Sequence, residues 1–478
     1  METRNFIGGE WSTPKNTTVD VFNPSDLSEK IGVINEGTEE DVLNAEKAAK
    51  EAQKEWAKKP GPQKAEILYN MAKALENNLQ EVAELGSKEM GKQIGEMKGE
   101  VTRGIHLLRY YAGEGIRSNG DVIPASDVDV LQYSQKIPLG VVGLITPWNF
   151  PVAIPIWKMA PALICGNAVI WKPAGDASLT ATRMVELFEE AGLPAGVLNL
   201  VVGKGSVVGK TLLEKADVNG VSFTGSGNTG SYVAKTCAAR NIKYQTEMGG
   251  KNVAVVMDDA NLDQTIPIIL SGAFKSAGQK CTATSRVIVQ EGVYDEVVKR
   301  LQKGVEDITL DNALDENAYL GPVASKDQFD KVSSYIQLAR DEANIVAEKN
   351  IESDRHGYYV SPIVITEAPS DHALVKEEIF GPVASLLKVK DYEEAISLAN
   401  DTVYGLSAAI FTENLPYAHK FLADSEAGMV RVNQETAGVE YQSPFGGLKD
   451  SSSNSREQGQ AALDFYTNTK TCAIKFFQ

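Results

Sequence analysis

Short, almost continuously apolar runs alternate with helical segments from about residue 140 onward. Such runs, bounded by Gly or Pro, occupy residues 141–145, 168–171, 197–202 and 220–223, and a helical pattern covers 179–191. Strands that are apolar on both faces and are connected through helices are typical of a parallel sheet with helices on both sides. The sequence therefore predicts a doubly wound α/β fold, in which ligands bind at the carboxyl ends of the strands.

The same alternation returns from Val253 onward, through residues 285–290 and 404–411, and it predicts a second α/β domain. Residues 39–117 instead show apolar positions every three or four residues, which predicts amphipathic helices. A chain of 478 residues exceeds the size at which a single hydrophobic core stops growing. We therefore expect two or three domains.

Charge and cysteine usage narrow the class of protein. A formal net charge of −17 opposes nucleic acid and anionic membranes as partners. The most apolar stretches, 137–147 and 159–171, fall short of the ~20 residues of a membrane span, and the N-terminus resembles no secretory signal. Four cysteines and four histidines are scattered without pattern, which predicts neither a disulfide framework nor a metal site. We expect a soluble, cytoplasmic protein.

One cysteine has a setting that suits a nucleophile. Cys281 follows a Gly-Gln-Lys turn, has small polar neighbours, and lies beside Lys280, whose charge is expected to favour the thiolate. Cys165, in an apolar run, fits a buried small residue instead. Taken alone, Cys281 is open to either interpretation.

Two further motifs favour the nucleophile. Glu247 opens the segment 247–252, and Asn149 lies within 147–151. A thiolate attacks a carbonyl carbon, a carboxylate activates water to release the acyl group, and an amide N–H holds the intervening oxyanion. The three side chains together predict acyl-enzyme chemistry.

A glycine-rich segment, 223–230, follows a strand-like run and opens a helix. Backbone N–H groups at such a helix N-terminus suit a pyrophosphate. The spacing Gly225-x-Gly227-x-x-Gly230 matches the dinucleotide fingerprint, although turn glycines produce it too, and the Gly-Lys-Ser/Thr ending of a P-loop is absent. Lys172 ends another strand-like run, as either a ligand contact or a solvated lysine.

In this order the motifs resemble those of the aldehyde dehydrogenase superfamily over essentially the whole chain. Within it, the chain most resembles bacterial 2-oxoglutarate semialdehyde (2,5-dioxovalerate) dehydrogenases, through residues 103–115, 151–158, 278–286 and 451–459. The superfamily motifs lie at residues 147–151, 172–173, 223–230, 247–250, 278–281, 377–382 and 443–447.

The resemblance implies a role for individual residues. Cys281 would be the nucleophile, Glu247 the base for deacylation, Asn149 with the Cys281 N–H the oxyanion hole, and Lys158 an assisting group. The implied cofactor contacts are Thr146, Trp148, Lys172, Gly175, Gly225, Ser226, Glu378 and Phe380. The implied substrate contacts are Arg103, Phe150, Trp157, Lys280 and Phe445.

The resemblance also implies a domain plan and a reaction. A Rossmann-like NAD(P)-binding domain would comprise residues 1–118 and 139–249, and an α/β catalytic domain residues 250–449. A small β flap, 119–138 with the tail 450–478, would support a homodimer or homotetramer. The expected reaction oxidises a small-molecule aldehyde to a carboxylic acid through a cysteine thiohemiacetal and thioester, with NAD or NADP and without a metal.

The choice of cofactor and the choice of substrate both stay open within this interpretation. Many NAD-preferring relatives carry a glutamate three residues after the lysine that matches Lys172, where this chain has Gly175; this favours NADP, with dual use because Asp176 follows. The substrate is expected to be 2-oxoglutarate semialdehyde, with Arg103 as the cation for its carboxylate unless Arg103 pairs with Glu100. Succinic semialdehyde or another small aldehyde is the alternative.

Two other functional classes are weighed against this reading. A catalytically silent structural relative would be expected to lack the nucleophile or the base. A CoA-acylating enzyme typically lacks the base. Cys281 and Glu247 are both present, so the sequence favours a dehydrogenase that oxidises an aldehyde and hydrolyses the resulting thioester.

Overall fold

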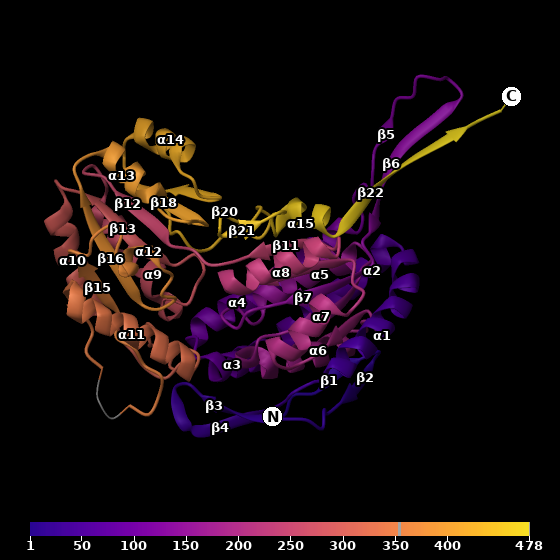
Figure 1. Cartoon of the computed structure of the whole chain (residues 1–478), viewed down its shortest axis with the longest axis horizontal. Helices are drawn as coiled ribbons and strands as arrows, with labels where there is room; N and C mark the ends of the chain where they lie inside the picture. The colour runs from indigo at the N-terminus through magenta and orange to yellow at the C-terminus, as the bar shows by residue number, and fades with distance from the viewer. Residues whose placement is uncertain (352–354, 478) are drawn as a thin grey trace.

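The computed structural model describes residues 1–351 and 355–477, and it shows two α/β units and a projecting arm (Figure 1). The first unit has an eight-stranded sheet in the order β2-β1-β9-β8-β7-β10-β11-β21, and the second a seven-stranded sheet in the order β14-β15-β16-β13-β12-β18-β19. The α/β prediction is confirmed. Within the described ranges, no helix is both long and apolar enough to cross a bilayer.

The central strands of the first sheet lie where the sequence predicted them. β7 (Val141–Ile145), β8 (Ala168–Lys172) and β10 (Gly220–Thr224) run parallel and are almost wholly buried. β9 (Leu198–Leu200) is shorter than the predicted run, because the Val202 N–H bonds to a side-chain oxygen instead of a strand. The sheet is completed by β1 (Asn5–Ile7), β2 (Glu10–Ser12), β11 (Lys243–Glu247) and β21 (Ser452–Ser453).

The predicted amphipathic region folds as four helices, and its ends follow local rules. The first helix begins with a capping box in which Thr38 and Asp41 satisfy each other's backbone N–H groups. The third ends at Gly91, whose φ of 79° favours glycine. The four helices are α1 (Glu39–Lys58), α2 (Gly61–Asn77), α3 (Leu79–Met90) and α4 (Ile94–Glu114).

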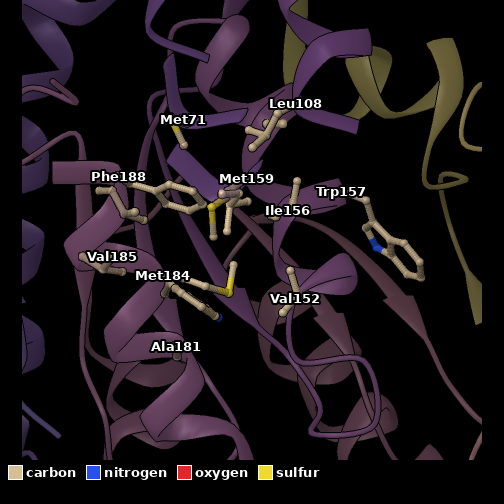
Figure 2. Packing of buried hydrophobic residues seen from close by; sticks show 14 of the residues in the cluster. Met71, Leu108, Val152, Ile156, Trp157, Met159, Ala181, Met184, Val185 and Phe188 are labelled. Carbon is tan, nitrogen blue, oxygen red and sulfur yellow. The ribbon is translucent and has the colours of Figure 1, made fainter. Parts of the chain in front are cut away.

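Helix α5 (Ala153–Ile164) lies in the middle of this core and is buried along its whole length. Figure 2 shows Ile156 of α5 packed among Leu108 of α4 and Phe188 of α6 (Ser178–Glu190), all fully buried. A helix that is apolar all round is held by packing on every side. The core thereby fixes Trp157 and Lys158, which α5 carries toward the catalytic centre.

The second unit repeats the plan with parallel central strands and one antiparallel edge. Its strands are β12 (Asn252–Val256), β13 (Thr284–Gln290), β14 (Asn344–Glu348), β15 (Ile363–Thr366), β16 (Val383–Val389), β18 (Ser407–Phe411) and β19 (Met429–Val432). Its helices are α9 (Leu262–Phe274), α10 (Tyr294–Glu306), α11 (Lys326–Glu342), α12 (Ala373–Lys376), α13 (Tyr392–Asn400) and α14 (Leu415–Asp424).

The arm is a three-stranded antiparallel sheet that extends away from both units (Figure 1). It comprises β5 (Val122–Ile123), β6 (Val130–Pro138) and β22 (Thr467–Lys475). Residues 450–466, the first part of the predicted C-terminal tail 450–478, contain β21 and α15 (Gly459–Phe465), which contact β11 and α5 of the first unit. The remaining elements are β3 (Thr18–Asn23), β4 (Asp26–Asn35), β17 (Tyr404–Gly405), β20 (Leu448–Lys449), α7 (Lys210–Glu214), α8 (Gly227–Ala239), η1 (Gly175–Ala177), η2 (Gly205–Gly209) and η3 (Lys275–Gly278).

Candidate active site

The carboxyl ends of the parallel strands meet at one edge of the first sheet. Ile145 lies opposite both Lys172 and Phe223, and Thr224 lies opposite Glu247. Strands β8 and β9 lie on one side of β7, and β10 and β11 lie on the other, so the order in which strands are added to the sheet reverses at β7. Such a switch point is where α/β sheets bind ligands.

A cavity of about 190 Å³ opens at this edge, and both units line it. Trp148 and Ser226 contribute from the first unit, and Glu378 and Phe380 from the second. The Trp148 and Phe380 rings meet edge to face with their centroids 5.6 Å apart. Cys281 also lines the cavity, so the predicted nucleophile and several predicted cofactor contacts share one cleft.

The three glycines of the motif differ in the space around them. Helix α8 begins at Gly227, inside the glycine motif, and a Cβ there would meet no atom within 4 Å. A Cβ at Gly225 would lie 2.7 Å from the Phe223 ring, and one at Gly230 would lie 2.4 Å from the Met248 sulfur. Gly227 therefore leaves open space at the helix N-terminus, whereas Gly225 and Gly230 are needed for packing.

Beyond this helix, Lys172 is buried at the end of β8, and burial lowers the pKa of its ammonium group to about 8. Asp176 lies close by, and burial together with the charge of Asp327 raises the pKa of that carboxyl to about 6. Gly175 has no atom within 4 Å of a Cβ position. Thr146, also at this edge, uses its hydroxyl to accept the Trp171 indole N–H at 2.9 Å.

Cys281 follows η3 and precedes β13, and its backbone carbonyl accepts the Asn252 side-chain amide at 2.8 Å. Its side chain packs against a small buried cluster of Leu406, Met429 and Phe445, and Val439 packs against the same cluster. Burial raises the pKa of the Cys281 thiol well above its usual range, and the charges of Glu378 and Glu247 raise it further. The protonated thiol is therefore the resting form.

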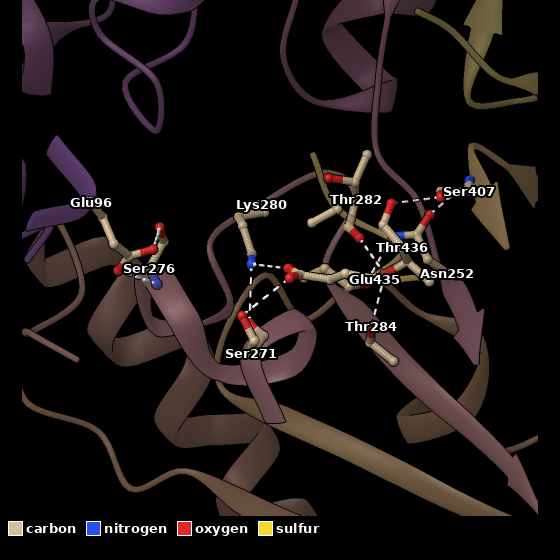
Figure 3. A network of polar contacts seen from close by, with 12 residues as sticks. Glu96, Asn252, Ser271, Ser276, Lys280, Thr282, Thr284, Ser407, Glu435 and Thr436 are labelled. Carbon is tan, nitrogen blue, oxygen red and sulfur yellow. Dashed lines mark hydrogen bonds and ion pairs between the residues drawn. The ribbon is translucent and has the colours of Figure 1, made fainter. Parts of the chain in front are cut away.

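The prediction that Lys280 favours the thiolate finds no support, because Lys280 is not among the leading influences on the Cys281 pKa and its own charge is paired. Its ammonium group points toward the second unit, where it contacts the Glu435 carboxylate at 3.1 Å and the Ser271 carbonyl at 3.2 Å (Figure 3). The side chain is only 8% exposed. A sequence cannot show that an adjacent lysine is turned away and neutralised by a residue more than 150 positions later.

The predicted oxyanion donor lies against the nucleophile turn. Asn149 is buried, and its amide nitrogen donates to the Gln279 carbonyl at 2.9 Å. The Asn149 backbone carbonyl accepts a hydrogen bond from Lys92 at 2.6 Å. The Asn149 side-chain amide is thereby held against Gln279, which lies two residues before Cys281 in the facing loop.

The predicted base, Glu247, is fully buried at the end of β11. Its Oε2 accepts the Ser452 hydroxyl at 2.5 Å, while its Oε1 has no hydrogen-bond partner among the described residues. Burial and the charge of Glu457 raise the pKa of Glu247 well above its usual range. A carboxylate with a raised pKa and a free oxygen is suited to accept a proton near neutral pH.

Lys158, predicted to assist, forms a buried ion pair with Glu457 and donates to the Ser222 hydroxyl at 2.8 Å. Its influence on Glu247 is electrostatic, since its charge lowers the pKa that Glu457 raises. Glu457 was not predicted as a functional residue. The sequence feature that could have identified Glu457 was a carboxylate inside the segment 451–459, which served only as evidence for the family resemblance.

Some of the predicted substrate residues lie beside Cys281, and others have contacts elsewhere. Trp157 and Phe445 pack together with ring centroids 5.2 Å apart, beside Cys281. Arg103 donates to the Val439 carbonyl and, at 3.0 Å, to the Gln458 side chain, and it makes no ion pair with Glu100. Phe150 carries the Lys92 ammonium over its ring at 3.7 Å. Lys280 lies apart from this group.

The chain belongs to the aldehyde dehydrogenase family, since that family's model matches residues 11–472. An alpha-ketoglutaric semialdehyde dehydrogenase of Bacillus subtilis (strain 168) is 50% identical over 476 residues, 98% of this chain and 98% of that protein. An alpha-ketoglutarate semialdehyde dehydrogenase of Haloferax volcanii is 40% identical, again over 98% of each. The NAD+ complex of an aldehyde dehydrogenase from Bacillus cereus superposes with a TM-score of 0.96 at 34% identity, covering 100% of this chain and 97% of that one.

Proposed function

We propose that the protein oxidises an aldehyde to a carboxylic acid with a nicotinamide dinucleotide as oxidant. The observation that carries this proposal is the position of Cys281, which lines the cleft on one side and packs against the cluster of Leu406, Met429 and Phe445 on the other. An aldehyde held by those side chains would lie between the thiol and a cofactor in the cleft. The family and the names of its relatives support the same reaction.

The residues divide the reaction into two steps. Glu247, one of the two carboxylates whose charges reach the thiol, accepts the Cys281 proton as substrate arrives and releases it to solvent before the second step. The sulfur bonds to the aldehyde carbon, and the Asn149 amide and the Cys281 N–H stabilise the oxygen, which becomes negative. A bound nicotinamide ring supplies the acceptor for the hydride that leaves this carbon.

A thioester remains on Cys281, and water must attack it. The Glu247 Oε1, which has no partner among the described residues, accepts the proton of that water while Ser452 holds the other oxygen. The C–S bond then breaks, the sulfur takes back the proton that Glu247 accepted from the water, and the acid leaves.

The residues present fit a nicotinamide dinucleotide. Gly227 leaves space at the N-terminus of α8 for a pyrophosphate, and the buried Thr224 hydroxyl has no partner among the described residues. Trp148 and Phe380 provide apolar walls. We infer use of both cofactors with a preference for NADP, because the open space at Gly175 admits a 2′-phosphate near the cationic Lys172.

The inferred substrate is 2-oxoglutarate semialdehyde, with succinic semialdehyde or another small aldehyde as the alternative. The names of the relatives support it. Arg103 is the inferred cation for the distal carboxylate, because it bonds to the carbonyl of Val439, whose side chain packs against the same apolar cluster as Cys281. Arg103→Met should cost an acidic semialdehyde about 2–4 kcal/mol in kcat/KM and spare propanal. Equal losses for both aldehydes would exclude this role.

The direct test is steady-state kinetics with a panel of aldehydes, each with NAD and with NADP. Wild-type protein should reduce cofactor fastest with the acidic semialdehydes, and Cys281→Ala should reduce none while unfolding at an unchanged temperature. Substantial turnover by Cys281→Ala would rule out the thioester mechanism.

We also propose that the arm is an oligomerisation flap. Val122, Val128 and Phe477 on or next to it are 77%, 97% and 90% exposed, which suits a surface covered by a second copy. A dimer or tetramer should be visible by sedimentation. The proposed domain division keeps residues 119–138 in the flap, and the four unpaired cysteines support the inferred cytoplasmic setting.

A further inference from the structure

Helix α4 contacts both loops that form the catalytic centre. We propose that its first two turns, through Glu96 and Glu100, position the oxyanion donor Asn149 relative to the nucleophile Cys281. These two carboxylates lie four residues apart and therefore on one face of the helix. The inference rests on the proposed roles of Asn149 and Cys281, and it assigns a positioning role to residues that bind neither substrate nor cofactor.

Glu100 holds the loop that carries Asn149. Its Oε1 accepts the backbone N–H groups of Val152 at 2.8 Å and Ala153 at 3.0 Å, at the start of α5. Its Oε2 pairs with Lys92 at 2.5 Å, and both side chains are 1% exposed. Lys92 then donates to the Asn149 backbone carbonyl at 2.6 Å. The loop is thereby bonded on both sides of residues 150 and 151.

Glu96 holds the loop that carries Cys281. Its two oxygens accept the backbone N–H and the hydroxyl of Ser276, each at 2.9 Å (Figure 3). Ser276 and Ala277 have φ values of 56° and 51°, a left-handed conformation that costs a non-glycine residue free energy. Gly278 continues it at 69°, and a Cβ there would lie 2.2 Å from the Gly381 carbonyl. Glu96 thus anchors a strained turn three residues before Gln279-Lys280-Cys281.

The two supports act on one rigid body. The N-terminus of α4 is itself fixed, because the Gln93 side chain accepts the N–H groups of Gly95 and Glu96 and the Ile94 N–H reaches the Ala313 carbonyl at 2.7 Å. Between the loops, Asn149 donates directly to the Gln279 carbonyl at 2.9 Å. A shift of either loop on α4 would therefore change the distance from the amide donor to the thiol.

Two variants separate the supports. Lys92→Met with Glu100→Gln removes both charges at once, which avoids an uncompensated buried charge, and the glutamine oxygen can still accept from α5. This double variant frees Asn149, so kcat should fall about 10- to 100-fold with KM for aldehyde within threefold. Alkylation of Cys281 by iodoacetamide, which needs no oxyanion donor, should stay within about twofold of the wild-type rate.

Glu96→Ala removes both bonds to Ser276, whereas a glutamine could still donate its amide N–H to the Ser276 hydroxyl. Glu96→Ala should therefore change both kcat and the alkylation rate of Cys281, each by more than fivefold. Amide hydrogen exchange should rise at residues 149–153 in the double variant and at 276–281 in Glu96→Ala. Glu316→Gln is the matched control, because its carboxylate pairs with Lys98 of the same helix at the surface, 74% exposed. It should leave every measurement unchanged.

The proposal is overturned if the double variant keeps kcat within twofold of wild type, or if alkylation and kcat fall together in both variants, which would indicate general loosening. Should the wild type oxidise no aldehyde at all, the proposed function fails. The alkylation and exchange measurements would still decide whether α4 positions the two loops.

Discussion

Two buried lysine–glutamate pairs flank the catalytic centre, and they are built differently. The side chains of Lys92 and Glu100 are each 1% exposed, and those of Lys158 and Glu457 are 0% and 1% exposed. Both Glu100 oxygens have partners: Lys92 on one, and two backbone N–H groups of α5 on the other. In Glu457, one oxygen takes every donor, and Oε2 has no partner among the described residues.

The difference teaches that burial and pairing alone do not decide what such a pair does. A carboxylate whose oxygens are all bonded to fixed donors holds those donors in place and serves as a support. The Glu457 carboxylate has a free oxygen, and its charge raises the pKa of Glu247. We infer that the Lys92–Glu100 pair holds geometry, whereas the Lys158–Glu457 pair sets the protonation of the base.

The largest effect is expected at the group that the Lys158–Glu457 pair influences. Glu247→Gln should slow release of the acid by about 10²- to 10⁴-fold, because the water loses its proton acceptor. Rapid mixing should show a burst of reduced cofactor, followed by a slow steady rate and a trapped thioester visible by mass spectrometry. Absence of the thioester, with hydride transfer as the slow step, would assign Glu247 another role.

Breaking either pair by one side chain should destabilise the protein similarly. Lys92→Met and Lys158→Met each leave a buried carboxylate without its cation, which costs about 3–5 kcal/mol in the free energy of unfolding. Urea titration measures this loss. Adding Glu100→Gln or Glu457→Gln, respectively, should recover most of it, and a single-variant loss below about 1 kcal/mol would contradict the burial of that pair.

The pH dependence of acid release should separate the two pairs. Glu457→Gln removes the negative charge that raises the pKa of Glu247 and leaves Lys158, whose charge lowers it. The Glu247 pKa should therefore fall, so that the base stays ionised at lower pH and the rising limb of the deacylation rate moves to lower pH. Glu100→Gln is the matched variant and should leave this limb in place; an identical shift in both would erase the distinction.

Another buried lysine, Lys172, extends the comparison because no carboxylate among the described residues forms an ion pair with it. Asp176 gains charge as pH rises through about 6, and Lys172 loses charge as pH rises through about 8. Both changes oppose a 2′-phosphate, so the dissociation constant of NADP relative to NAD should rise across this range. Fluorescence titration of cofactor binding measures it.

Gly175→Glu should add a further carboxylate at this site, where a Cβ meets nothing within 4 Å. The expected penalty for NADP over NAD is about 1 kcal/mol, roughly fivefold, the size of one solvent-screened charge contact. Asp176→Asn should flatten the pH dependence below 8. An equal effect of Gly175→Glu on both cofactors would mean that residue 175 lies away from the 2′ position.

Much of the scaffold could be predicted from local sequence. Apolar runs predicted β7, β8 and β10, because a strand buried on both faces needs apolar residues at every position. Cys281, Glu247 and Asn149 were predicted from short motifs and a family resemblance. In the structure Cys281 and Asn149 line the cleft, and Glu247 lies near enough for its charge to act on the thiol. These features depend on a few consecutive residues, so the sequence by itself determined them.

The properties of those residues depend on partners far along the chain, and only the tertiary structure decided them. Lys280 is neutralised by Glu435, so it does not activate the adjacent thiol. Glu457 reaches Glu247 across 210 positions and changes its pKa, and Glu96 of the first unit anchors Ser276 of the second. Electrostatic and hydrogen-bond energies depend on distance and burial in space, and neither quantity is written in the spacing of residues along a chain.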